Sequence, residues 1–188
     1  MILGVDVGIR NFAYCIRDSN KKLFKCVEVI DFFDLEIEEF PRRKRKNSIK
    51  QLKSTDIHDY TQILFKHIFT STFMSKIESV KIESLPHRCN RKVWLLTHLV
   101  YSRMQELKNR SLPFLRVSFV NGKKKYDRHL FLLSFYQQLD LRSRSYQIRK
   151  QNSVTIFLAV TRHFKICVNA LGPKLDDAAD AYLLTFVK

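Results

Sequence analysis

Three aspartates near the end of the sequence have a spacing that suits chemistry. The segment Lys174-Leu-Asp-Asp-Ala-Ala-Asp180 puts Asp177 and Asp180 three residues apart, which is the same face of a helix. Leu184 continues this face and predicts that it points inward. Two carboxylates held this close are typical of a divalent-cation site. They are also typical of a first helical turn, where acids complement the helix dipole, and Asp176 adds a second pairing with Asp180.

Two further acids lie at the ends of predicted strands. Residues 2–7 form a short apolar run that carries Asp6, and residues 79–83 alternate like a strand up to Glu83. Strand ends are where α/β folds place their sites, so these carboxylates are expected beside the pair on the last helix. Glu78 is a rival for Glu83, but it precedes its strand.

The elements that must position these acids predict an α/β fold with a mixed central sheet flanked by helices. Apolar runs at 2–7, 12–17 and 23–30, separated in part by a turn at 18–22, predict an antiparallel meander. The later patterns predict helices at 56–74, 90–108, 123–139, 153–164 and from about 174 onward, and strands at 79–83 and 112–120. The length of 188 residues suits a single domain over residues 1–188.

The charge balance favours a polyanionic partner. Lys and Arg number 34 against 18 Asp and Glu, so the formal net charge is +16; an anionic membrane surface is the second choice. The 41–53 segment holds seven basic residues and no acid, and a second basic segment spans 142–150 around Tyr146. Contact with nucleic-acid phosphates is the functional interpretation of the 41–53 segment. A nuclear targeting signal and a solvated loop are its alternatives.

Other classes of protein are disfavoured by the sequence. It has no run of about 18 apolar residues that would predict a membrane span. No charged leader with an apolar core precedes the first strand, so an intracellular rather than secreted protein is expected. Reduced cysteines, rather than a zinc site or disulfides, are predicted because no C-x-x-C spacing occurs among Cys15, Cys26, Cys89 and Cys167.

Three motifs, taken together and in this order, resemble the Holliday-junction resolvases of the RuvC type. They are Asp6-Val-Gly-Ile-Arg-Asn11, of the form D-x-G-x-[KR]-N, then Ile82-Glu-Ser-Leu-Pro86, of the form I-E-x-x-P, and Lys174–Asp180, of the form K-x-D-D-x-A-D. Each motif alone is weak, since D-x-G also opens actin-like ATPases. The first and last resemble the poxviral and mitochondrial branch, so a poxvirus or another large DNA virus is the expected source. Residues 36–58 match no part of the family pattern.

The resemblance implies a ribonuclease H-like fold with four metal-binding carboxylates: Asp6, Glu83, Asp177 and Asp180. Its D-x-x-D spacing selects Asp177 over Asp176. It also implies a catalytic lysine at the start of the helix after the fifth strand. That lysine falls within residues 123–125, where Lys124 and Lys125 are favoured and the register stays open. The residues expected to contact DNA are Arg10, Asn11, Arg42, Arg43, Lys44, Arg45, Lys123 and Arg144.

A homodimer is also implied by the resemblance, and the helix predicted over 90–108 suits its interface. The apolar face of this helix is broad enough to serve both a core and a partner subunit. Burial of the whole helix within its own domain is the alternative. No membrane is expected as a partner.

The activity implied is Mg²⁺-dependent nicking of opposing strands of four-way DNA junctions. In a virus this would serve recombination and the resolution of replicated concatemers, at a cytoplasmic replication site if the source is a poxvirus. Two Mg²⁺ ions per site, about 4 Å apart, can activate a water and neutralise the phosphate, and Mn²⁺ is expected to substitute. The alternatives are another ribonuclease H-like nuclease, a nucleic-acid-binding module without catalysis, and an actin-like phosphotransferase, which the four glycines disfavour.

Overall fold

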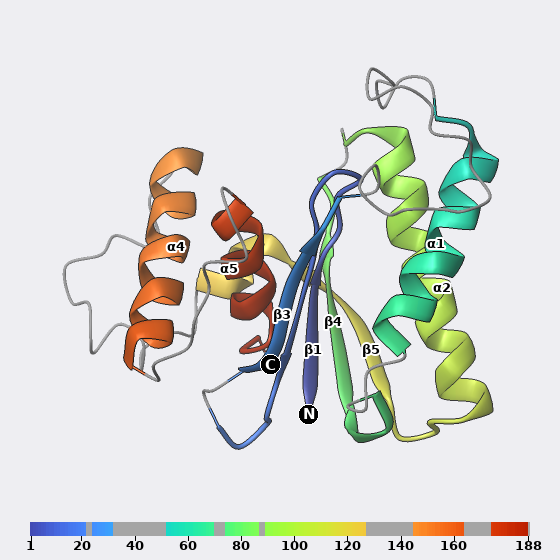
Figure 1. Ribbon diagram of the computed structural model, residues 1–188, viewed down its shortest axis with the longest axis horizontal. Helices are drawn as coiled ribbons and strands as arrows, with labels where there is room; N and C mark the ends of the chain where they lie inside the picture. Colours follow the sequence, from blue (N-terminus) through green and yellow to red (C-terminus); the bar gives the residue numbers. More distant parts are fainter. Residues whose placement is uncertain are drawn as a thin grey trace.

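The molecule is built on a five-stranded mixed sheet in the order β3-β2-β1-β4-β5 (Figure 1). The computed structural model describes residues 1–21, 24–31, 52–69, 74–86, 89–126, 145–163 and 174–187. Its strands are β1 Ile2–Asp6, β2 Phe12–Arg17, β3 Phe24–Ile30, β4 Ser79–Ser84 and β5 Arg116–Asn121. Strands β1 to β3 pair antiparallel, whereas β4 pairs parallel to both β1 and β5. The predicted meander and mixed sheet are therefore confirmed.

Helices cover both faces of this sheet. Helices α1 Ser54–Phe69 and α2 Arg91–Arg110 lie on one side, and α4 Tyr146–His163 and α5 Leu175–Leu184 lie on the other (Figure 1). Strand β2 is buried along its whole length because alternate side chains enter the two cores. Tyr14 and Ile16 join the core beneath α1 and α2, and Ala13 and Cys15 join the core beneath α4 and α5. None of the described helices is long and apolar enough to cross a membrane.

Several predicted boundaries are wrong. Strand β5 begins at Arg116 rather than Leu112, because a turn follows α2 in which the Leu115 amide donates to the Leu112 carbonyl around Pro113. Helix α4 begins at Tyr146, seven residues earlier than predicted, so part of the second basic segment is helical. After β5 the chain forms a short 3₁₀ helix, η3 Gly122–Tyr126, and the rest of the helix predicted to 139 lies outside the described residues. A second 3₁₀ helix, η2, spans Met74–Lys76.

Candidate active site

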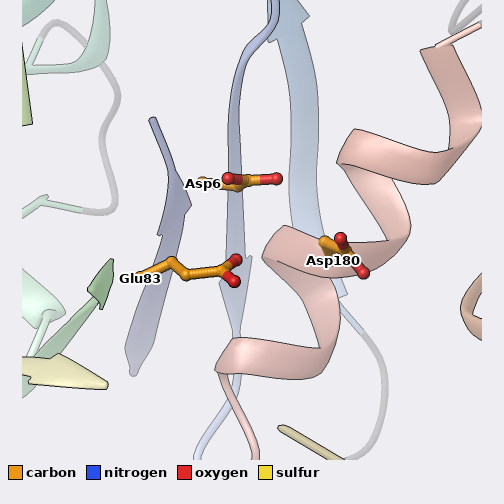
Figure 2. A group of neighbouring side chains, drawn as sticks. All are labelled: Asp6, Glu83 and Asp180. Carbon is orange, nitrogen blue, oxygen red and sulfur yellow. The ribbon is translucent and has the colours of Figure 1, made fainter. Parts of the chain in front are cut away.

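Two of the predicted carboxylates meet at one edge of the sheet. The parallel pairing of β1 with β4 aligns Val5 with Ile82. Asp6 and Glu83 are the next residues of the two strands, so their side chains lie side by side near the carboxyl ends of β1 and β4. Figure 2 shows them extending toward α5, which carries Asp180. One carboxylate oxygen from each of Asp6, Glu83 and Asp180 lies within 4.8 Å of the other two.

Two glycines allow this close approach. A Cβ atom on Gly4 would collide with the backbone carbonyl of Ala181, so the absent side chain lets α5 lie directly on β1. A Cβ atom on Gly122 would collide with the carboxylate of Glu83, so η3 can also lie against the site. In both places the backbone itself approaches a partner closely, which is a common use of glycine.

Lys125 is the lysine of the 123–125 group that the structure brings to the acids. Its Nζ lies 3.0 Å from Glu83 Oε2 and 2.9 Å from Asp180 Oδ2, and its side chain is only 4% exposed. Lys123 and Lys124, in contrast, are both exposed. The geometry therefore selects one of the two positions that the sequence left open.

Lys150 is a second lysine at the acids, and sequence reasoning missed it. Its Nζ lies 3.0 Å from Asp180 Oδ2, 3.3 Å from Asp177 Oδ1 and 3.2 Å from Asp176 Oδ2. In the sequence this residue is one charge of a basic segment. A helix beginning at Tyr146 would have been the useful signal, because it fixes which side of that segment faces α5.

The Asp176–Asp177 pair is distinguished by burial. The Asp177 side chain is 13% exposed and that of Asp176 is 40% exposed. Asp177 lines the same cleft as Asp6, Glu83 and Asp180, although it is not one of the three acids whose oxygens converge. Asp177 is thus the more buried of the two neighbouring acids, and its role as a metal ligand stays a prediction.

The electrostatics of the site reflect crowded, buried acids. Burial raises the pKa of Asp6 well above its usual value, and the charges of Glu83 and Asp180 raise it further. Burial also raises the pKa of Asp177, although Lys150 opposes that rise. Burial alone would lower the pKa of Lys150, but Asp180, Asp177 and Asp6 together hold it above its usual value. Asp6 and Asp177 therefore need positive charge beside them in order to stay ionised.

The donor set fits a divalent cation. Asp180 Oδ1 is buried and has no hydrogen-bond partner within the described part of the chain. A buried carboxylate oxygen without a partner is costly unless a ligand satisfies it. The converging atoms are all carboxylate oxygens, the ligands that Mg²⁺ and Mn²⁺ prefer. The acidic triad could therefore hold a divalent cation, and Asp180 Oδ1 is an oxygen left available for it.

The acids lie in a cleft of about 640 Å³. Of the residues expected to contact DNA, Arg10, Asn11 and Lys123 line this cleft. Tyr146 and Arg149 also line it, and both were missed as site residues. The remaining predicted contacts lie outside the described residues: Arg42, Arg43, Lys44, Arg45 and Arg144.

One segment of this chain and its overall fold are similar to known proteins. Residues 135–187 match the family described as poxvirus A22 protein. The yeast mitochondrial Holliday junction resolvase Ydc2 aligns with a TM-score of 0.63 and 16% identity, over 98% of this chain and 76% of that one. The chain therefore shares the fold of this resolvase, and its residues 135–187 are similar to the poxvirus A22 family. The resemblance and the fold class predicted from the three motifs are therefore confirmed.

Two further resolvase folds are similar, and both were solved with DNA. Fowlpox virus resolvase in complex with substrate Holliday junction DNA aligns with a TM-score of 0.53 and 15% identity, over 98% of this chain and 93% of that one. RuvC of T. thermophilus in complex with a Holliday junction substrate aligns with a TM-score of 0.50 and 14% identity, over 97% of this chain and 90% of that one. No curated protein sequence is significantly similar to this chain.

Proposed function

We propose that the chain is a metal-dependent endonuclease that resolves four-way DNA junctions. The convergence of Asp6, Glu83 and Asp180 at the ends of two parallel strands, in a resolvase fold, carries this proposal. The formal net charge of +16 supports a DNA substrate. The fowlpox and T. thermophilus proteins share the fold and were solved with Holliday junction DNA, which supports a branched DNA substrate.

The residues of the cleft have distinct roles in this proposal. Asp6, Glu83, Asp177 and Asp180 bind two Mg²⁺ ions per site, with Mn²⁺ as a substitute. Bound Mg²⁺ supplies positive charge at the phosphate and activates a water for attack. Lys125 holds Glu83 and Asp180 in place and adds positive charge where the phosphate gains negative charge.

DNA contacts surround these groups. Arg10, Asn11 and Lys123 contact phosphates at the wall of the cleft, which they line together with the acids. Such contacts position a duplex arm without reading its sequence.

The biological role proposed is the resolution of junctions during viral DNA recombination and replication, including concatemer resolution. The match of residues 135–187 to the poxvirus A22 family supports this role. The site of action would then be the cytoplasmic replication site of the host cell. A single nuclease domain over residues 1–188 is part of the same proposal.

A labelled immobile four-way junction tests the activity. We expect Mg²⁺-dependent nicks at symmetric positions on two opposing strands, mapped by sizing all four strands. An RNA–DNA hybrid and a linear duplex of the same sequence are the control substrates. Preferred cleavage of the hybrid would indicate another ribonuclease H-like nuclease, and junction binding without any cleavage would indicate a binding module.

The proposed homodimer uses an exposed aromatic surface on α2 and the edge strand β5. Most of the apolar face of α2 packs inside its own domain. Leu96, Val100 and Met104 are buried in the core, and Leu99 is partly buried against it. The aromatic surface consists of the neighbouring rings of Trp94, His98, Phe119 and Tyr101, with Trp94 50% exposed and Phe119 39% exposed. Exposed aromatic residues of this kind are typical of interface centres.

Replacing Trp94 by Glu is therefore expected to weaken self-association by about tenfold or more, because a charge would enter the centre of the interface. Sedimentation velocity over a concentration series measures it. Ile148→Glu is the control, since Ile148 is 44% exposed on α4, across the sheet from α2 (Figure 1). A wild-type chain that is monomeric at micromolar concentration, yet nicks junctions symmetrically, would contradict the dimer.

Salt dependence tests the basic segment at 41–53. Neutralising Arg42, Arg43, Lys44 and Arg45 together should flatten the slope of log affinity against log salt concentration. Removing one phosphate contact changes this slope by about 0.9 on duplex DNA. Fluorescence anisotropy of a labelled junction at several salt concentrations gives the slope. An unchanged slope would remove the segment from the DNA-binding surface.

A further inference from the structure

Lys150 contacts one acid of the converging triad, Asp180, and two acids outside it, Asp176 and Asp177. Its Nζ contacts Asp177 Oδ1 at 3.3 Å and Asp180 Oδ2 at 3.0 Å, and its side chain is 17% exposed. A contact of 3.2 Å to the half-exposed Asp176 completes the set. One ammonium group thus holds a group of carboxylates that would otherwise repel one another, in the same cleft as the triad.

The two oxygens of Asp180 are used unequally. Oδ2 receives both ammonium groups, Lys125 at 2.9 Å and Lys150 at 3.0 Å. Oδ1 has no hydrogen-bond partner among the residues that the structure describes. A cation at Asp6, Glu83 and Asp180 could therefore use Oδ1 with Lys150 left in place. A cation held by Asp177 and Asp180 would have to compete with Lys150 for both side chains.

We propose that Lys150 is a positioning residue that competes with a divalent cation for Asp177 and Asp180. Without DNA, the chain then takes up one cation readily, at Asp6, Glu83 and Asp180. A second cation binds well only when Lys150 has been drawn away from the acids. This inference rests on the proposed function, because it assigns the order in which the nuclease site is loaded.

A DNA phosphate is the group suited to draw Lys150 away. Lys150 lies on the first turns of α4, where Tyr146 and Arg149 line the cleft beside it. Tyr146 is 64% exposed, and its ring centroid lies 5.9 Å from Lys150 Nζ, so the ammonium group is close to an open part of the cleft. A lysine suits this exchange because its compact charge sits on a flexible four-carbon chain. Substrate binding would then favour full loading with metal.

Counting bound Mn²⁺ in the DNA-free protein tests this inference. After chelator treatment and dialysis, Mn²⁺ is titrated and the free ion is measured by electron paramagnetic resonance. Wild type should bind one Mn²⁺ per chain at concentrations where Lys150→Met binds two. The second ion should bind Lys150→Met at least about tenfold more tightly, because a unit positive charge a few ångströms away has been removed. Lys150→Gln is a second neutral variant, in case the Met variant folds poorly.

Two controls separate competition from a general charge effect. Lys150→Arg keeps the charge and should restore one Mn²⁺ per chain. Lys66→Met removes the same charge from an exposed position on α1, across the sheet from α5 (Figure 1), and its Mn²⁺ titration should match wild type. In a separate titration, a four-way junction that carries phosphorothioates at its scissile positions is added in Ca²⁺-free buffer. The number of Mn²⁺ ions bound per chain should then rise toward two in wild type and stay at two in Lys150→Met.

The outcomes distinguish this inference from the function on which it rests. Equal Mn²⁺ number and affinity in wild type and both neutral variants would overturn the role of Lys150, while junction cleavage by wild type would leave the nuclease proposal standing. No Mn²⁺ binding by any variant would overturn both. One Mn²⁺ in wild type and two in Lys150→Met, in a protein that cleaves no junction, would support the competition and overturn the nuclease proposal.

Discussion

Replacing Asp180 by Asn is expected to abolish junction cleavage while leaving junction binding intact or tighter. Asp180 is the most buried acid of the site, with a side chain 3% exposed, and it serves both lysines through one oxygen. The amide keeps the shape but loses the negative charge that holds a cation, and it repels the DNA backbone less. A loss of about a thousandfold or more in single-turnover rate corresponds to about 4 kcal/mol of transition-state stabilisation.

The same result is expected for Asp6→Asn, Glu83→Gln and Asp177→Asn. Because the acids act as a unit, a double variant should lose little more activity than a single one. Asp176→Asn is the matched control, since its side chain is 40% exposed, and substantial activity should survive.

Single-turnover cleavage and junction anisotropy, measured on the same preparations, check these expectations. An inactive Asp176→Asn beside an active Asp177→Asn would show that the D-x-x-D register is wrong. Unchanged cleavage in every one of these variants would end the metal-dependent nuclease proposal.

Replacing Lys125 by Met should also remove most of the cleavage activity, by about a hundredfold to a thousandfold, which is the usual loss for one group that stabilises charge in the transition state. Lys125 is 4% exposed and contacts both Glu83 and Asp180. The substitution removes positive charge from the place where the phosphate reacts. The rate at saturating DNA should therefore fall with little change in junction affinity.

Lys124→Met is the control for this substitution, because Lys124 precedes Lys125 directly and is exposed. It should keep most of its cleavage rate. Breaking a buried ion pair also destabilises a fold, so thermal melting of both variants is measured with and without Mg²⁺. A folded Lys125→Met enzyme with a normal rate, or an inactive Lys124→Met enzyme, would contradict the assignment of Lys125.

Much of the fold and part of the site were determined by the sequence alone. Alternating and apolar runs are local signals, so the meander and β4 were predictable from short windows. Asp6 and Glu83 were predictable for a related reason, since each comes at the end of such a run. Asp180 followed from the helical period of its own segment. Each of these inferences needs only neighbouring residues.

The lysines were decided only by the tertiary structure. Lys125 meets Glu83 across 42 residues, and Lys150 meets Asp177 across 27 residues. Neither contact has a local signal, because it depends on where η3 and α4 pack against α5. In the sequence, Lys150 was one charge of a basic segment, and Lys124 and Lys125 were the two favoured lysines of the 123–125 group, with no signal to choose between them. Packing of α5 on β1 at Gly4 sets the position of the acids, and the acids then select which ammonium groups are buried among them.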